Sequence, residues 1–496
     1  MGAMTSPQHN PWRALWALVL GFFMILVDST IVSVATPALK AELDATYVQV
    51  IWVTSAYLLA YAIPLLVTGR LGDRFGPKNI YLGGLALFTA SSLWCGLTDS
   101  IEMLIVARVL QGLGASMMTP QTMSVVTRTF APRERGKAMA LWGATAGAAM
   151  LVGPVLGGII VQHAGWQWIF LVNIPVGIIA FALAMAWVPT LPTHSHAFDW
   201  FGVVLSMLGI SFLTFGIQEG ETYDWGTIAG WVSVPLLLAS GIALMAAFIW
   251  WQAKNVREPL VPLSLFKDRN FSVSSAGVAT LSFTSIAFPF PFMLWAQSAM
   301  GWTPTQAGLV MSPMAVVAVV MSRPVGQMID RGDPKPLAIY GSLLSAGATA
   351  LMIWAMRVEA GYLPWLALFL LVGLGNALLW SPLATNATFN LPMNLAGAGS
   401  GVYNSMRQMG AVIGSAAISA AITMAVARNM SSTGMAGTQG SNVVLPPEQV
   451  RSFSIAMSES LYLVLAAYVV GFVIITMMAP RPPKVVEKID GISYGN

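Results

Sequence analysis

Apolar residues along this chain gather in long runs of about twenty, separated by short polar segments. The first run begins near Trp12 and contains one carboxylate, Asp28. About twenty apolar residues form a helix that crosses the roughly 30 Å hydrocarbon core of a bilayer, whereas the strands of a membrane barrel would alternate apolar and polar positions. The pattern predicts fourteen membrane-spanning helices, at residues 12–36, 47–69, 79–98, 102–125, 138–162, 166–188, 200–218, 228–251, 271–297, 303–327, 337–356, 361–389, 397–427 and 456–479.

Composition indicates the same class of protein. Of the 496 residues, 56% are hydrophobic and 9% are charged, whereas a soluble domain is about a quarter charged. The first run is longer than the apolar core of a signal peptide and lacks a small-residue cleavage site, so we expect it to remain as a span. Lys and Arg are dispersed among the loops, so no nucleic acid partner is expected. The sequence predicts an all-α polytopic protein of the inner or plasma membrane.

The basic residues predict how the spans are oriented. If the N-terminus is cytoplasmic, the segments on that side contain 18 of the 24 Lys and Arg and the opposite segments contain 4, while Arg108 and Arg407 fall within spans. Cytoplasmic loops of membrane proteins carry an excess of basic residues. Because the number of predicted spans is even, both termini are expected to be cytoplasmic.

An internal repeat predicts the organisation of the spans. The stretch "GRLGDRFGPK" begins at Gly69, at the end of the second span, and "GQMIDRGDPK" begins at Gly326, at the end of the tenth; they share five of ten positions. Parallel repeats of six spans build one large class of transporters. We expect two pseudo-symmetric six-helix bundles at 12–188 and 271–479, two additional central spans at 200–251, and a cytoplasmic linker at 252–270.

Asp28 is the residue that most constrains the function. A charged side chain at the centre of a bilayer costs about 3 kcal/mol or more unless it is paired or hydrated. Arg108 is its expected partner, since Asp28 lies roughly 13 Å below Pro37 and Arg108 lies roughly 10 Å below Glu102, at the outer ends of their helices. Protonation of Asp28 would leave a buried arginine uncompensated. The pair is therefore a candidate proton site; a static ion pair is the alternative.

The fifth span contains "GATAGAAMLVGPVLGG", with Gly143, Gly147, Gly153, Pro154, Gly157 and Gly158. Regularly spaced glycines let two helices approach closely, and a proline removes a helical hydrogen bond. The stretch favours a kinked helix that seals the two bundles against each other. Ordinary tight packing is the alternative.

Several stretches together resemble the signature motifs of the major facilitator superfamily, and of its fourteen-span drug:proton antiporter branch in particular. "VDSTIVSVATP" resembles the first-span motif of that branch, "RVLQGLGA" resembles the arginine motif of the fourth span, and "GPVLGG" resembles the antiporter motif. "GRLGDRFGPK" resembles the loop motif, with Pro77 where a basic residue is usual. "GWQWIFLVNIPVG" and "YNSMRQMGAVIG" resemble further stretches typical of the branch.

The resemblance implies roles for particular residues. It implies that Asp28 takes part in proton coupling and that Arg108 supports this step. Together with the repeat, it predicts a cytoplasmic gate on both halves, formed by Gly69, Asp73, Arg74, Lys78, Asp330 and Arg331. It assigns the antiporter motif to Gly147, Gly153, Pro154, Gly157 and Gly158.

Aromatic and polar residues inside the spans are candidates for a substrate cavity. Pro289 and Pro291 must distort the ninth span, and broken helices in membranes tend to line cavities. Arg407 lies mid-membrane without an acidic residue nearby in the sequence, so either backbone carbonyls or a polar group of the substrate would neutralise it. The predicted cavity residues are Trp52, Tyr57, Tyr61, Gln111, Trp142, Phe288, Phe292, Trp295, Trp380, Asn404 and Arg407.

These observations predict a proton-coupled exporter of amphiphilic or hydrophobic small molecules that works by alternating access. The tenth span lacks an acid, which favours neutral or weakly basic substrates over dications. Export of lipids or lipid-like metabolites, or a membrane sensor that binds without transport, are the alternatives. The chain has no GxxxxGK[ST] loop and no evident nucleophile constellation, so no enzymatic activity, cofactor or metal is expected. The expected partners are the proton, the substrate and the bilayer, with a monomeric transport unit.

Overall fold

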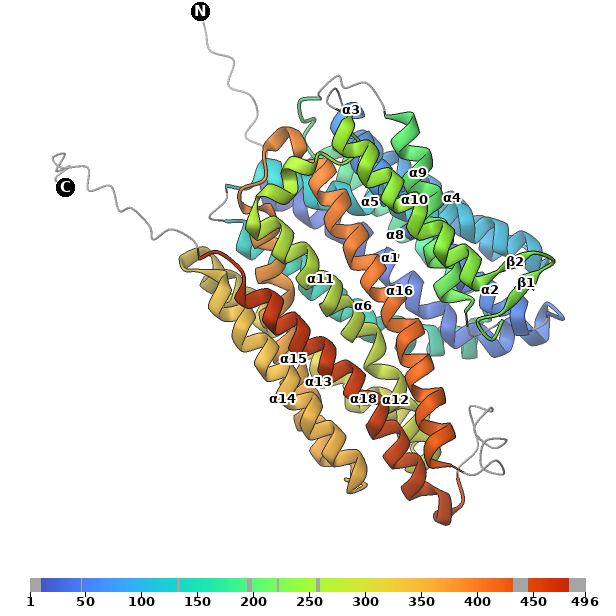
Figure 1. Ribbon diagram of the computed structural model, residues 1–496. Helices are drawn as coiled ribbons and strands as arrows, with labels where there is room; N and C mark the ends of the chain where they lie inside the picture. The colour runs from blue at the N-terminus through green and yellow to red at the C-terminus, as the bar shows by residue number, and fades with distance from the viewer. Residues whose placement is uncertain are drawn as a thin grey trace, which may run out of the picture.

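The computed structural model describes residues 10–45, 47–131, 134–193, 199–220, 223–255, 259–430 and 445–480. Within these ranges the chain is almost entirely helical, and the long helices run side by side (Figure 1). In that view α14 and α18 lie at one edge of the molecule and α4, α9 and α10 lie at the other. The all-α polytopic fold predicted from the apolar runs is confirmed.

The N-terminal helices are α1 (Pro11–Glu42), α2 (Tyr47–Ala62), α3 (Leu65–Phe75), α4 (Pro77–Leu97), α5 (Ile101–Thr129), α6 (Arg135–Ala164), α7 (Trp168–Leu171) and α8 (Asn173–Trp187). The second predicted span consists of two helices, α2 and α3, which bend by 47° at the break between them. Pro64 accounts for this break, because proline lacks the amide hydrogen that a continuous helix requires.

Two further helices, α9 (Trp200–Gln218) and α10 (Val234–Lys254), follow and pack against each other. Helix α9 also contacts α2 and α16, and the ring centroids of Trp52 and Phe215 are 5.6 Å apart. The predicted span at 228–251 begins too early. Its first residues belong to an antiparallel hairpin, β1 (Thr227–Ala229) and β2 (Val232–Ser233), whose turn contains Gly230 at φ +54°.

The C-terminal helices begin after the short 3-10 helix η1 (Leu263–Lys267). They are α11 (Arg269–Ala287), α12 (Pro289–Leu294), the π-helical turn η2 (Trp295–Ala299), α13 (Pro304–Arg331), α14 (Pro334–Arg357), α15 (Tyr362–Phe389), the 3-10 turn η3 (Met393–Leu395), α16 (Ala396–Asn429) and α18 (Pro447–Thr476). The ninth span is interrupted at Phe288, as Pro289 and Pro291 predict.

By length and composition, twelve helices among the described residues are apolar and long enough to cross a membrane, or thirteen if α2 and α3 count as one span. The remaining predicted span, at 138–162, coincides with α6, which has 30 residues. Each predicted span therefore has a helix at its position. The count of fourteen crossings and the sides of the termini stay predictions.

The loop motif is largely helical. The predicted second span ends at Gly69, but Gly69 to Phe75 belong to α3 and the turn is confined to Gly76, whose φ of +88° suits a glycine. The corresponding stretch at Gly326 lies within α13 up to Arg331. Asp73 and Asp330 therefore lie on the last turns of their helices.

Asp199 ties the two additional helices to the segment that follows them. It caps α9 by accepting a hydrogen bond from Gly202 N (2.9 Å), and it also accepts from Trp251 Nε1 (2.9 Å) and Gln252 Nε2 (2.8 Å). Leu260 N donates to the same carboxylate. Burial acts to raise the pKa of the Asp199 carboxyl, but these hydrogen bonds outweigh it and hold the pKa below its usual value.

We expect Asp199→Asn to lower the melting temperature of the detergent-purified protein at pH 7 by about 2 °C, since a charge-assisted hydrogen bond is worth about 1–2 kcal/mol. A lowered folded-state pKa stabilises the fold fully above the usual value of 3.8, and this contribution is lost as the pH falls further. The difference in melting temperature between wild type and variant should therefore become smaller below that pH. Asp224→Asn, at an exposed carboxylate, is the matched control, and a difference independent of pH would contradict the assignment.

Candidate functional site

Asp28 and Arg108 form an ion pair in the interior of the N-terminal helices. Arg108 Nη1 of α5 lies 2.5 Å from Asp28 Oδ2 of α1, and both side chains have zero solvent exposure. The other carboxylate oxygen, Oδ1, accepts from Gln111 Nε2 and from Asn173 Nδ2, each at 2.9 Å. Helices α1, α5 and α8 thus meet at one carboxylate.

Further polar groups complete this network. Ser92 Oγ of α4 accepts from the same two amides, Gln111 Nε2 at 3.1 Å and Asn173 Nδ2 at 3.0 Å, and donates to Phe170 O. Sequence reasoning missed Ser92 and Asn173. The polar Asn173 within the apolar stretch "FLVNIPVG" was the available signal, but only the packing of α8 against α1 shows what it contacts.

Several groups hold the side chain of Arg108. Its Nε donates to Val53 O at 3.0 Å, its Nη1 also donates to Gln111 Oε1 at 2.7 Å, and its guanidinium lies 4.0 Å from the centre of the Tyr57 ring. A cation over an aromatic face is stabilised when it is desolvated. Loss of the negative charge on Asp28 would leave this buried cation without a counter-charge, which is energetically costly. The geometry can therefore link a protonation event to helix movement.

On the predicted cytoplasmic side, Asp73 of α3 binds the N-terminus of α16. Its two oxygens accept from Gly397 N and Ala398 N, each at 2.9 Å. Helix N-termini attract negative charge because their first amides are unpaired and the helix dipole is positive there. The absence of a side chain at Gly69 lets α3 and α16 approach closely enough for this contact, since a Cβ at that position would lie 2.5 Å from Gly397 O.

Asp330 of α13 makes the equivalent contact in the opposite direction. Its Oδ1 accepts from Gly136 N of α6 at 2.9 Å, and its Oδ2 lies 3.8 Å from Lys137 Nζ. One acid of the repeat therefore reaches from the N-terminal to the C-terminal helices, and the other reaches back. We call the Asp73–α16 and Asp330–α6 contacts the two clasps.

Other gate candidates lie around the clasps. Lys78 Nζ donates to Met185 O at 2.7 Å, Arg74 is exposed with its guanidinium 5.2 Å from the Phe75 ring centre, and Arg331 is exposed at the end of α13. Arg135, which the sequence did not single out, is buried at the start of α6 and donates to Thr388 O of α15 and to Thr127 O of α5. It adds a third connection between the two sets of helices.

The glycines of α6 face two different neighbours. A Cβ at Gly147 would lie 2.7 Å from the Cβ of Ala318 in α13, and one at Gly157 would lie 2.7 Å from Ile31 Cγ1 in α1. A Cβ at Gly153 would overlap Thr30 Oγ1, whereas nothing lies within 4 Å at Gly158. Helix α6, which also contains Pro154, therefore packs closely against α1 on one face and α13 on another. The predicted kink stays untested.

The predicted cavity residues separate into distinct environments. Phe288 and Trp380 line a cavity between α6 and the C-terminal helices, whereas Phe292 and Trp295 are fully buried in an aromatic core with Trp365. Tyr57 and Gln111 belong to the Asp28 network, Trp52 packs on Phe215, and Asn404 Nδ2 donates to Ser400 O.

Arg407 of α16 connects the two sets of helices. Its Nη2 donates to Tyr61 OH of α2 at 3.0 Å, and its guanidinium lies 5.8 Å from the ring centre of Phe22 and 5.7 Å from that of Trp142. Tyr61 OH is in turn 3.0 Å from Thr119 Oγ1. In this structure the arginine side chain is held by protein groups and is 7% exposed.

A buried charged network, long apolar helices and reciprocal contacts between two sets of helices define the class of protein: a multi-pass helical transporter of the plasma membrane. A family model described as Major Facilitator Superfamily matches residues 18–415. The chain belongs to the major facilitator superfamily, as its motifs predicted.

Relatives and solved structures agree with this family. The chain is 46% identical to the MFS-type transporter Rv1250 of Mycobacterium tuberculosis, over 96% of this chain and 82% of that protein. It is 31% identical to the tetracenomycin C resistance and export protein of Streptomyces glaucescens, over 83% of this chain and 76% of that protein. The proton:xylose symporter XylE has the same fold, with a TM-score of 0.63 and 14% identity over 93% of this chain and 94% of that one.

Proposed function

We propose that this protein exports amphiphilic or hydrophobic small molecules across the plasma membrane in exchange for protons. The observation that carries the proposal is the fully buried Asp28, bound at once by Arg108, Gln111 and Asn173 from two other helices. Relatives whose names refer to antibiotic export and multidrug resistance support the direction of transport and the kind of substrate.

The exchange follows from the two protonation states of Asp28. The ionised carboxylate holds α1, α5 and α8 together, and the clasps hold the predicted cytoplasmic side closed. A proton that reaches Asp28 from outside neutralises it and weakens its attraction to Arg108, because ion pairs in a low-dielectric interior depend on both charges. The helices then rearrange, the clasps open, and the molecule faces the cytoplasm to bind new substrate.

The proposed moving parts are two six-helix bundles, at 12–188 and 271–479, with the additional helices at 200–251 and the linker at 252–270 between them in sequence. The contacts that join the bundles support this division, since the Asp73 and Asp330 clasps are reciprocal and are located on the same predicted side. Such rocking of two repeats around a central site is how this kind of fold gives alternating access.

Proteoliposomes containing the purified protein test the proposal. We expect an outward-directed concentration gradient of substrate to drive protons in the opposite direction, for at least one compound in a small panel of hydrophobic dyes and antibiotics. A pH-sensitive dye inside the vesicles detects this proton movement. Lipid-like compounds form a second arm, because export of lipids was the alternative prediction. Arg407, its candidate headgroup partner, donates one hydrogen bond to Tyr61 OH in this structure. Binding without any coupled proton movement for all compounds would overturn proton-coupled export.

A further inference from the structure

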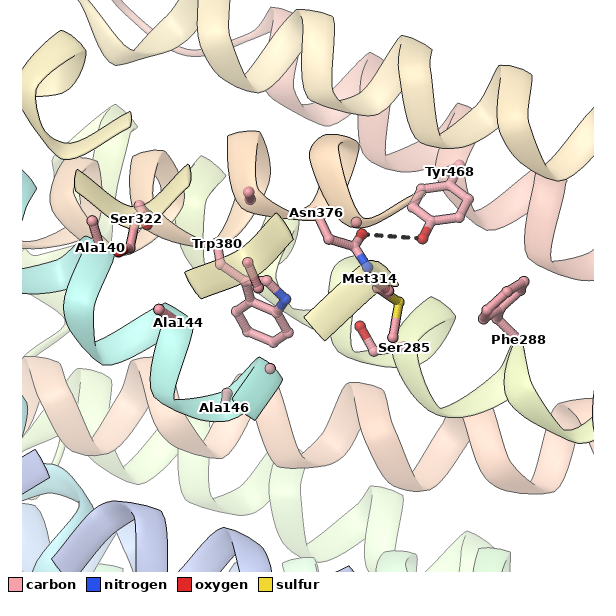
Figure 2. A pocket seen from close by; sticks show the side chains of 16 residues that line it. Ala140, Ala144, Ala146, Ser285, Phe288, Met314, Ser322, Asn376, Trp380 and Tyr468 are labelled. Atoms are coloured by element: carbon pink, nitrogen blue, oxygen red, sulfur yellow. Dashed lines mark hydrogen bonds between the residues drawn. The ribbon is translucent and has the colours of Figure 1, made fainter. Parts of the chain in front are cut away.

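A cavity of about 70 Å³ lies between the N-terminal and C-terminal helices, away from the Asp28 network. Figure 2 shows its walls. Helix α6 contributes one wall of small residues, including Ala140, Gly143 and Gly147, while α11, α13, α15 and α18 contribute the rest. Because the walls come from both sets of helices, the width of the cavity depends on how closely the two sets approach.

The larger side chains of the cavity make it apolar. Phe288 at the end of α11, Met314 of α13 and Trp380 of α15 surround the space in Figure 2. Thioether sulfur atoms make favourable contacts with aromatic rings and adapt to irregular shapes. The volume seen here is less than half of the ~150 Å³ of an engineered apolar cavity that binds one benzene ring. A ring therefore enters beside the small α6 wall only when the two sets of helices move apart.

None of the residues that line the cavity is charged. The hydroxyls of Ser285 and Ser322 donate to carbonyls of their own helices, Leu281 O at 2.8 Å and Val319 O at 2.7 Å. A charged ligand placed here would lose its hydration without gaining a counter-charge, which costs several kcal/mol. The cavity therefore discriminates against ions.

Asn376 of α15 places a hydrogen-bond donor in this apolar space. Tyr468 OH of α18 donates to Asn376 Oδ1 at 3.3 Å, the dashed line in Figure 2. The tyrosine thereby occupies the acceptor end of the amide and orients the Asn376 Nδ2 group, which makes no hydrogen bond to another described residue. An unpaired amide donor beside aromatic walls favours a ligand that brings a neutral acceptor oxygen.

We propose that this cavity is a binding subsite for neutral aromatic carbonyl compounds. The carbonyl oxygen accepts a hydrogen bond from Asn376 Nδ2, and the attached ring packs against Trp380, Phe288 and Met314. The inference rests on the export function proposed above and names its substrate class. It assigns the recognition of neutral substrates to Asn376 and Tyr468, which are remote in sequence from the motifs of the proton site.

A matched pair of photoreactive probes tests this proposal. Benzophenone is neutral and carries the carbonyl, and (4-benzoylbenzyl)trimethylammonium adds a fixed positive charge to the same group. On irradiation the ketone abstracts a hydrogen from a nearby C–H bond, and the two carbon radicals combine into a C–C bond with the ketone reduced to an alcohol. Mass spectrometry then compares the labelling of Met314 with that of Met424, which is 60% exposed on α16 and reports non-specific contact.

In the wild-type protein we expect benzophenone to label Met314 about tenfold more than the cationic probe does, relative to Met424. Asn376→Asp keeps the size of the side chain and adds a negative charge, so it should shift this ratio at least tenfold towards the cationic probe. Tyr468→Phe frees the amide to turn its oxygen into the cavity and should lower benzophenone labelling about threefold; it serves as a second variant should Asn376→Asp fold poorly.

Equal labelling of Met314 and Met424 by benzophenone, or a probe preference that neither variant changes, would overturn the subsite. Labelling is carried out in detergent without a proton gradient. A failure here therefore leaves the role of Asp28 unaffected, and a failure of proton coupling leaves the expected labelling pattern unchanged.

Discussion

Asp28→Asn is expected to abolish uphill export driven by a pH gradient, with accumulation reduced at least a hundredfold and the protein still folded. Asparagine has nearly the same shape as aspartate and can still accept a hydrogen bond from Arg108, but it has no carboxylate to protonate at any pH. The cycle therefore loses its response to the proton. Proteoliposomes with an imposed pH gradient and a fluorescent hydrophobic dye provide the measurement.

The variant should keep its fold because the substituted amide retains partners in Gln111 and Asn173, although the uncompensated Arg108 lowers its stability by about 3–5 kcal/mol if no rearrangement occurs. Size-exclusion chromatography and thermal melting check this. Asp99→Asn is the matched control, since Asp99 is exposed in the connection before α5 and its variant should retain full activity. Undiminished uphill pumping by Asp28→Asn vesicles would show that coupling occurs elsewhere.

The double variant Asp73→Asn with Asp330→Asn is expected to open the predicted cytoplasmic side. Each clasp contributes charge-assisted hydrogen bonds to a helix N-terminus, worth about 1–2 kcal/mol. Loss of one clasp should raise the population of the open form about tenfold, and loss of both should raise it about a hundredfold if the two act independently.

Cysteine accessibility measures this opening. The chain has one cysteine, the buried Cys95, so Cys95→Ala provides a background for Ser124→Cys. Ser124 of α5 is fully buried and its hydroxyl makes no hydrogen bond to the described residues, so the added sulfur is a mild change. The rate of alkylation by a membrane-impermeant maleimide, applied from the cytoplasmic side, should increase in proportion to the open population.

Asp333→Asn is the control for this experiment. Asp333 caps α14 by accepting a hydrogen bond from Lys335 N at 3.0 Å. This contact lies within the C-terminal helices, so it does not join them to the N-terminal helices. We expect its variant to alkylate at the rate of the background. Unchanged alkylation in the double variant would mean that other contacts, such as Arg135 with Thr388, hold this side closed by themselves.

The apolar runs predicted the helices well because a bilayer imposes length and hydropathy on every segment that crosses it. The pairing of Asp28 with Arg108 followed from matched depths and from the cost of an unpaired buried charge. The errors were local. The span at 228–251 starts in a hairpin, and the loop motif is helical up to Phe75, because hydropathy reports burial in lipid and is insensitive to the exact residue at which a helix begins or ends.

By itself, the sequence determined the class of fold, the pairing of Asp28 with Arg108 and the presence of two equivalent acidic motifs, since these depend on composition, spacing and the energetic cost of a buried charge. Tertiary structure alone decided which groups those acids contact. Asp73 binds amides about 320 residues away along the chain and Asp330 binds one about 190 residues away; Asn173 and Ser92 converge on the Asp28 network. Such partners are backbone amides and uncharged side chains that occur throughout the chain, and only the packing of helices selects among them.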